Sequence, residues 1–187
     1  ILSVSRLVPR KGIDAMLEAL RLILAEVPQC AYVIAGTGGQ ERELRAMVKR
    51  LGLGPNVVFV GQVSHQVKTA LYQMCDVFVL PTRDLPDGNF EGFGIVFLEA
   101  AACAKPVVAG RSGGVPDAVI DGETGILVPP HSPREVASAV VRLLRDASLA
   151  RRLGQQGRAR AATMTWTATA QVVRETLGRL VTPNLPG

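Results

Sequence analysis

The fold of this chain is decided by the segment from Val77 to Ala109, which reads VFVLPTRDLPDGNFEGFGIVFLEAAACAKPVVA. Short apolar runs begin and end this segment, and between them lies a helical stripe formed by Leu98, Ala101 and Ala102. A strand, a helix and a second strand in this order are typical of a right-handed βαβ unit in a parallel sheet. The long loop from Pro81 to Gly94 follows the first strand. Open α/β sheets bind ligands beyond the carboxyl ends of their strands, so this loop is a prime candidate for a site.

The same alternation of apolar runs and helical stripes extends over the rest of the chain. Runs that are apolar on both faces are typical of strands in the interior of a covered sheet. Three further helical patterns follow the last run, near 136–144, 149–153 and 166–180. The sequence therefore predicts an α/β fold with a single Rossmann-like, doubly wound parallel sheet of about six strands and a C-terminal helical tail. The expected strands are Ile1 to Ser5, Ala31 to Ala35, Val57 to Val60, Val77 to Leu80, Val107 to Ala109 and Ile126 to Val128.

Length and composition limit the class of protein. The chain has 187 residues, of which 48% are apolar and 20% are charged. These values are near the globular average and exclude a disordered or collagen-like chain. No apolar run approaches the ~18 residues that cross a bilayer, so we expect a soluble protein. The three cysteines stand singly in apolar surroundings, which favours a reducing, cytoplasmic setting. Ile1 lies inside an apolar run, which indicates a piece of a longer polypeptide, and residues 182–187 are expected to form a frayed tail.

The cysteine, histidine and arginine patterns argue against several kinds of site. The three cysteines and two histidines lack the spacing of a disulfide framework or a zinc site, so we expect no metal site. Arginines are frequent after residue 130 but scatter around the predicted helices, which favours a solvated face over a nucleic-acid surface. Peripheral contact with an anionic membrane remains an alternative for these arginines. The apolar stripe of the last helix, which begins near Trp166, is expected either to be partly exposed or to pack on the domain's edge.

The loop from Arg6 to Gly12 places cations at the binding edge of the predicted sheet. Arg6, Arg10 and Lys11 follow the first strand and precede the first helix. Guanidinium and ammonium groups beside the free N–H groups of a helix start favour a negatively charged ligand such as a diphosphate. Ordinary surface charge is the alternative explanation for these cations.

The glycines after the second strand, Gly36-Thr-Gly38-Gly39, occupy the place where a dinucleotide fingerprint is sought. Glu41 replaces the third glycine of GxGxxG, and no acidic residue ends the third strand. A nicotinamide or flavin cofactor is therefore disfavoured, and a tight turn is the commoner role of such glycines.

The run EGFGIVFLEA, from Glu91 to Ala100, combines open backbone with two carboxylates. Its two glycines leave the backbone accessible where a helix begins, so an anion or sugar hydroxyls can meet the N–H groups of Phe93, Gly94 and Ile95. Glu91 lies just before the expected helix and Glu99 lies inside it. Carboxylates are good acceptors for paired sugar hydroxyls, so this run indicates a sugar or nucleotide ligand.

Together these motifs resemble the series found in the retaining group 1 glycosyltransferases, family 4, of GT-B fold. The resemblance covers residues 1 to about 181 and rests on Arg6-x4-Lys11-Gly12, the GxG of Gly36 and Gly38, EGFGxxxLEA and Gly113-Gly114-Val-Pro-Asp117. Members have two Rossmann-like domains facing a cleft, and the C-terminal one binds most of the nucleotide-sugar. The resemblance implies that residues 1–181 are this nucleotide-sugar-binding domain and that the N-terminal acceptor domain is absent from this chain.

The resemblance also implies roles for particular residues. Arg6 and Lys11 would grip the donor's diphosphate and Glu91 would contact the transferred sugar, and these three are the implied catalytic residues. Glu99 would bind the ribose hydroxyls, and Val63 would lie near the base. The donor would be a UDP- or GDP-linked hexose. The remaining implied donor-binding positions are Gly12, Gly36, Gly38, Gly92, Phe93, Gly94 and Ile95.

Sugar transfer leaves two negative charges on a nucleoside diphosphate, and a DxD pair would hold a metal to stabilise them. The chain has no DxD pair, and Arg6, Lys11 and a helix N-terminus can take the place of the metal, so no metal or other cofactor is expected. Alone, this half is expected to bind the donor without transferring sugar. The alternatives are a nucleotide-sugar epimerase domain of the same fold and a non-catalytic nucleotide-binding module, while the broken fingerprint disfavours a dehydrogenase-like domain.

Overall fold

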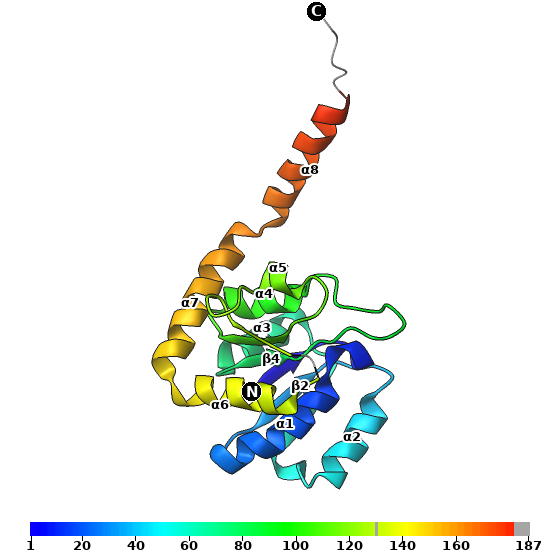
Figure 1. Ribbon diagram of the computed structural model, residues 1–187, viewed down its shortest axis with the longest axis vertical. Helices are drawn as coiled ribbons and strands as arrows, with labels where there is room; N and C mark the ends of the chain where they lie inside the picture. The colour runs from blue at the N-terminus through cyan, green and yellow to red at the C-terminus, as the bar shows by residue number, and fades with distance from the viewer. Residues whose placement is uncertain (130, 182–187) are drawn as a thin grey trace, which may run out of the picture.

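A computed structural model describes residues 1–129 and 131–181 and places a six-stranded parallel sheet at the centre of the protein (Figure 1). The strand order is β3-β2-β1-β4-β5-β6, so the chain winds outward from the middle in both directions. This order is that of the Rossmann fold and confirms the predicted doubly wound sheet. The strands are β1 (Leu2–Val4), β2 (Tyr32–Ala35), β3 (Val57–Gly61), β4 (Phe78–Leu80), β5 (Val107–Gly110) and β6 (Ile126–Val128).

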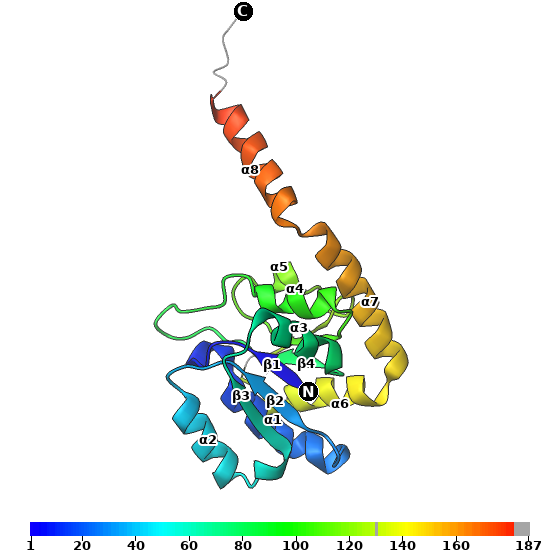
Figure 2. The same cartoon turned by 180° about the vertical axis from the view of Figure 1, so that it is seen from behind.

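Helices cover both faces of the sheet. Contacts between helices group α1, α2 and α6 on one face and α3, α4 and α5 on the other, and α7 packs against α4 (Figures 1 and 2). Two single 3₁₀ turns, Pro9–Lys11 and Gly54–Asn56, lie in the loops. The helices are α1 (Ile13–Glu26), α2 (Glu41–Arg50), α3 (His65–Met74), α4 (Ile95–Ala102), α5 (Val115–Ala118), α6 (Pro133–Arg145), α7 (Ala147–Thr163) and α8 (Trp166–Val181).

The predicted helical stripes form the core between sheet and helices. Met16, Leu20 and Ile23 of α1 are fully buried, as are Val136 and Val140 of α6, and the two helices pack together over one face of the sheet. Burying such side chains contributes about 1.5–3 kcal/mol each, which makes this layer a major source of stability.

The expectation that every strand is covered on both faces is wrong for β3. This strand lies at the edge of the sheet, and its side chains alternate between half-buried and exposed. Val58 and Val60 are exposed. The ring of Phe59 is covered by Arg45, whose guanidinium carbon Cζ lies 4.3 Å from the ring centroid. Four consecutive apolar residues predict a strand but not its place in the sheet, because placement depends on the strand order.

The last helix leaves the body of the protein. α8 projects from the end of α7 as an arm (Figures 1 and 2), and Trp166 is 80% exposed. Val173 and Leu177 of its stripe are also exposed, so of the two alternatives the exposed one holds. No helix within the described ranges has both the length and the apolar character needed to cross a membrane. The expected frayed tail, 182–187, lies outside the described residues.

Gly36 and Gly38 allow two loops to stack. The backbone N–H of Leu7 donates to the Thr37 carbonyl at 2.9 Å, and the Gln40 N–H donates to the Leu7 carbonyl at 3.0 Å. A Cβ at Gly36, where φ is +128°, would overlap the Ser5 carbonyl oxygen, and one at Gly38 would lie 2.6 Å from the Leu7 nitrogen. The glycine pattern thus has a packing role, which fixes the loop after β1 against the loop after β2.

Gly38→Ala is expected to lower the free energy of unfolding by about 1–3 kcal/mol, because the new methyl group must push two backbone segments apart. Gly39→Ala is the matched control, since a Cβ there would meet nothing within 4 Å. We expect Gly39→Ala to change the stability by less than about 0.5 kcal/mol. Urea denaturation of both variants measures the difference, and equal stabilities would contradict the loop stacking.

Candidate functional site

The site forms where the strand order reverses. β1 and β4 are neighbours in the sheet, but the chain winds from them toward opposite edges, and ligands of open α/β sheets bind at such a point. The loop after β1 and the loop after β4 cross there. The Arg83 N–H donates to the Arg10 carbonyl at 2.9 Å, and Gly12, with φ +69°, lies so near Pro81 that a Cβ would overlap its carbonyl oxygen. Gly12 therefore permits the crossing of the two loops.

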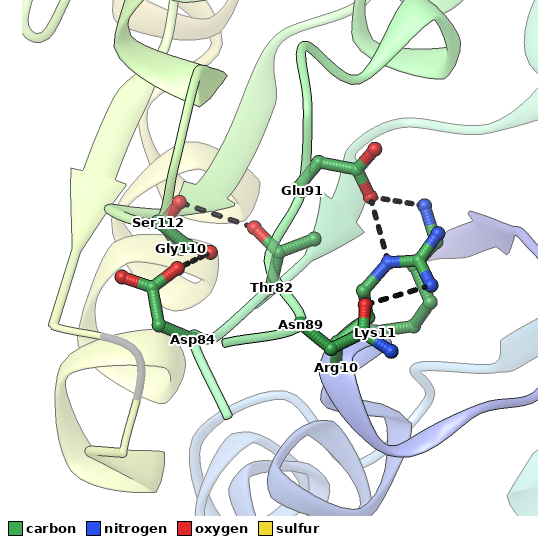
Figure 3. Close-up of polar contacts among 8 residues, drawn as sticks. All are labelled: Arg10, Lys11, Thr82, Asp84, Asn89, Glu91, Gly110 and Ser112. Carbon is green, nitrogen blue, oxygen red and sulfur yellow. Dashed lines mark hydrogen bonds and ion pairs between the residues drawn. The ribbon is translucent and has the colours of Figure 1, made fainter. Parts of the chain in front are cut away.

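A buried ion pair joins these loops (Figure 3). The Lys11 ammonium donates to Glu91 Oε2, and both residues are only 8% exposed. Arg10 Nε lies 3.9 Å from the same oxygen, and Arg10 Nη1 donates to Asn89 Oδ1 at 3.3 Å. The 3₁₀ turn Pro9–Lys11 projects both cations toward Glu91, and its Pro9 presets the backbone for the turn. The site therefore holds two cations around one carboxylate.

The loop after β5 contacts the backbone of Glu91. The Gly114 N–H donates to the Glu91 carbonyl at 2.9 Å, and a Cβ at Gly113, where φ is +48°, would overlap that carbonyl oxygen. In the same region Ser112 Oγ donates to Asp84 Oδ1 at 2.7 Å (Figure 3). The loops after β1 and β5 thus both contact the end of the loop after β4, at the short segment that begins at Glu91.

The N-terminus of α4 presents unpaired donors beside this pair. Gly94 is the N-cap residue, with φ +85°, and a Cβ there would overlap the ring of Phe97. Within residues 1–129 and 131–181, no protein acceptor faces the backbone N–H groups of Phe93, Gly94 and Ile95. Gly92 and the Ile95 side chain are exposed. The arrangement suits an anion or hydroxyl groups approaching from solvent.

Glu99 is held separately from Glu91. Lys68 Nζ lies 2.5 Å from Glu99 Oε1, and the Tyr72 hydroxyl donates to Oε2 at 2.8 Å. Both partners come from α3, so Glu99 faces a different element from Glu91. Removing a charge from water costs free energy, and these two hydrogen bonds offset that cost for the partly buried Glu99 carboxylate.

The structure leaves Arg6 and Val63 apart from the ion pair. Arg6 is exposed, and among the described residues its guanidinium has no hydrogen bond or ion pair. Val63, in the loop after β3, is half-buried against the core, and Ser64 beside it caps α3 by accepting from the Val67 N–H at 3.3 Å. The roles implied for Arg6 and Val63 stay predictions.

Sequence reasoning misses the part played by Arg10 and by the 83–89 segment. Arg10 stands among three cations without a distinct role, and no pattern marks Asn89 as its partner. The run Asp87-Gly88-Asn89 is a turn signal that could have drawn attention to this segment, and in the structure Gly88 has φ +79° and the Asn89 N–H donates to Asp87 Oδ1 at 3.0 Å. Within the described parts of the chain, no three His, Cys, Asp or Glu residues gather closely enough to hold a metal ion.

The fold and the site define a Rossmann-like α/β domain with cations and unpaired N–H groups at its switch point, and comparison with known families is more specific. The family model described as glycosyl transferases group 1 matches residues 1–160. The chain therefore belongs to the group 1 glycosyl transferases.

Two relatives share much of the sequence. The chain is 42% identical over 159 residues to a GDP-mannose-dependent alpha-(1-6)-phosphatidylinositol monomannoside mannosyltransferase of Mycolicibacterium smegmatis, a match that covers 84% of this chain and 42% of that protein. It is 35% identical over 179 residues to a D-inositol 3-phosphate glycosyltransferase of Corynebacterium jeikeium, over 92% of this chain and 41% of that protein. The chain thus spans about two fifths of the length of these curated relatives.

Solved structures show the same fold. The Anabaena protein HepE, crystallised with UDP and glucose, superposes with a TM-score of 0.83 at 29% identity, over 95% of this chain and 47% of that one. The C-terminal domain of a group 1 family glycosyl transferase from Francisella tularensis gives a TM-score of 0.76 at 27% identity, over 87% of this chain and 84% of that one.

Lys11→Met is expected to lower the free energy of unfolding by about 3 kcal/mol, because it leaves the buried Glu91 carboxylate without its main partner. Lys49→Met, at an exposed lysine of α2, is the control and is expected to change stability by less than about 0.5 kcal/mol. The double variant Lys11→Met/Glu91→Gln should recover much of the loss. Urea denaturation of the wild type, Lys11→Met, Glu91→Gln and the double variant forms the cycle, with Lys49→Met measured beside it, and strictly additive effects would show that the pair is not coupled.

Proposed function

We propose that this chain is the donor-binding half of a retaining glycosyltransferase that transfers mannose from GDP-mannose without a metal. The observation that carries the proposal is the buried Lys11–Glu91 pair, which lies beside the unpaired N–H groups at the start of α4. Arg6, which is exposed, belongs to the same loop after β1. A GDP-mannose donor is supported by the relative that is 42% identical. An N-terminal acceptor domain in the same polypeptide is supported by the match to a separate C-terminal domain from Francisella tularensis.

The proposed chemistry is stabilisation of a departing nucleoside diphosphate. Breaking the bond between sugar and phosphate leaves negative charge on the phosphate oxygens, and groups that bind this charge more tightly in the transition state speed the reaction. Arg6 offers a guanidinium that the described residues do not use, and Lys11, in the same loop, offers an ammonium that Glu91 holds in place. Preorganised charges and N–H groups of this kind can supply about 2.7–4 kcal/mol each, so no metal is needed in this proposal.

Glu91 is proposed to position the sugar. Its carboxylate is fixed by Lys11 and Arg10, and its free lone pairs can accept from sugar hydroxyls. A double displacement would need a carboxylate nucleophile at the anomeric carbon. An anion already bound to two cations is a weak nucleophile, so we favour attack by the acceptor on the face that the diphosphate leaves, which also retains configuration.

The residues of this chain point to a donor and to no particular acceptor. The relatives are named for different acceptors, among them phosphatidylinositol monomannoside and inositol phosphate. Acceptors lie on the other half of the proposed enzyme, outside this chain. We place the enzyme in the cytoplasm, and peripheral contact with a membrane surface through the arginines of α7 remains part of the proposal.

GDP is expected to stabilise this chain against thermal unfolding, by about 2.7 kcal/mol at 100 times its dissociation constant. Arg6→Ala should weaken GDP binding about 10- to 100-fold, because one charged hydrogen-bond partner contributes about 1.5–3 kcal/mol. Arg6 has no protein partner, so this variant should keep its unliganded melting temperature.

A thermal-shift and calorimetric panel of GDP, UDP, ADP and NAD makes this measurement, with Arg45→Ala on α2 as the exposed arginine control. Stabilisation by NAD alone, or undiminished GDP binding in Arg6→Ala, would contradict the proposed donor site. UDP binding tighter than GDP binding would keep the site but overturn the choice of base.

The full polypeptide that contains this chain is expected to transfer mannose with retention in the presence of excess EDTA, since cations of the protein replace a metal. Proton NMR of the first product identifies the anomer, and an α product from the α-linked donor is the expected result. A β product would contradict retention, and activity restored only by Mg²⁺ or Mn²⁺ would contradict metal independence. Release of a 2-epimeric sugar without an acceptor would favour an epimerase.

A further inference from the structure

Two residues of a neighbouring helix donate hydrogen bonds to the Glu99 carboxylate. Lys68 and Tyr72 are four residues apart on α3, so they project from one face of that helix. Lys68 Nζ lies 2.5 Å from Glu99 Oε1, and the Tyr72 hydroxyl donates to Oε2 at 2.8 Å. Each oxygen of the carboxylate therefore has its own donor, and the plane of the carboxylate is fixed.

Tyr72 is buried in the core and packs against other aromatic rings. It is 2% exposed, and its ring lies 5.5 Å, centroid to centroid, from that of Phe78. Phe78 in turn packs edge-on against Phe97, at 5.9 Å, and Phe97 lies two residues before Glu99 on α4. Burial, reinforced by the charge of Glu99, raises the pKa of the Tyr72 phenol, so the hydroxyl keeps its proton and donates.

The carboxylate is fixed from the core side while its other side remains open. The Glu99 side chain is 29% exposed and borders a groove that it shares with Phe93, Ile95 and Leu98. Each carboxylate oxygen has about two acceptor positions, and α3 uses one on each. Two acceptor positions, one per oxygen, thus remain for two neighbouring hydroxyl groups of a ligand.

A phenylalanine at position 72 would fill the same space in the core. A buried hydroxyl costs stability unless it is hydrogen-bonded, and among residues 1–129 and 131–181 the one acceptor of this hydroxyl is Glu99. The hydroxyl therefore acts on the orientation of Glu99 and contributes nothing to the aromatic packing.

We propose that Lys68 and Tyr72 are positioning residues that orient Glu99 to accept both hydroxyls of a ribose, which makes the site selective for ribonucleotides. This inference rests on the proposed nucleotide-sugar function and adds a determinant of specificity to it. The two residues do not touch the ligand themselves. Their effect appears as the ratio between the affinities for GDP and for 2′,3′-dideoxy-GDP, in which both hydroxyls are missing.

The test measures dissociation constants of the two nucleotides by calorimetry. Wild-type protein is expected to bind GDP at least about tenfold more tightly than dideoxy-GDP, since two hydrogen bonds to a charged acceptor are lost. Tyr72→Phe should reduce this ratio about three- to fivefold while dideoxy-GDP binding stays unchanged. Lys68→Met should reduce it further, and Lys68→Arg should restore most of it.

Tyr32→Phe is the matched control. Tyr32 is also fully buried and also donates to a single side chain, Ser3 Oγ at 2.8 Å, but it lies on β2. We expect this variant to lose some stability and to keep the wild-type ratio. Lys68 is partly exposed, so its variants test the proposal even where Tyr72→Phe does not fold.

An unchanged ratio in both Tyr72→Phe and Lys68→Met, with wild-type selectivity intact, would overturn this inference and leave the donor site standing. Equal weakening of GDP and dideoxy-GDP in those variants would also overturn it, since that result marks a purely structural role. Wild-type protein that binds neither nucleotide would overturn the inference together with the proposed function.

Discussion

The buried ion pair between Lys11 and Glu91 is the interaction on which the site depends. Two charges that are almost excluded from water cost several kcal/mol each to desolvate, and the structure retains them where the chain could have placed apolar residues. The pair closes the gap between two loops that leave neighbouring strands and then diverge. It also brings the start of α4, with its unpaired N–H groups, beside the cations of the first loop. The geometry proposed for the diphosphate follows from this one contact.

Helix α4 organises the rest of the site. Glu91 precedes it and Glu99 lies five residues beyond its N-cap, a rise of about 7.5 Å along the axis. The first carboxylate is held by the loop after β1 and the second by α3, so the two face different parts of a ligand. The helix N-terminus lies between them. A nucleotide-sugar has a matching order of parts, since its diphosphate separates the hexose from the ribose.

Most of the fold is predictable from the sequence, because its signals are local. Apolar runs such as Val77 to Leu80 correspond to the strands, and the stripe of Met16, Leu20 and Ile23 identifies α1. The single turn of α5 is not predictable in this way, since four residues carry no periodicity. The exposed face of β3 also escapes prediction, because it depends on the order of strands in the sheet.

The site is predictable in its residue types but not in its pairings. The sequence indicates cations after the first strand and carboxylates around Gly94. Which cation meets which carboxylate depends on the 3₁₀ turn at Pro9 and on the left-handed conformation of Gly12, and both are set by contacts between distant loops. Lys68 and Tyr72 have no motif at all, because they meet Glu99 from 31 and 27 residues away in the chain, a separation that no local pattern encodes.

The most direct test of the account is a crystal structure of this chain with GDP bound. The account predicts diphosphate oxygens within hydrogen-bond distance of the Arg6 guanidinium, the Lys11 ammonium and the backbone N–H of Ile95. A nucleotide bound away from the crossing of the loops after β1 and β4, with Arg6 still free of any ligand, would contradict it.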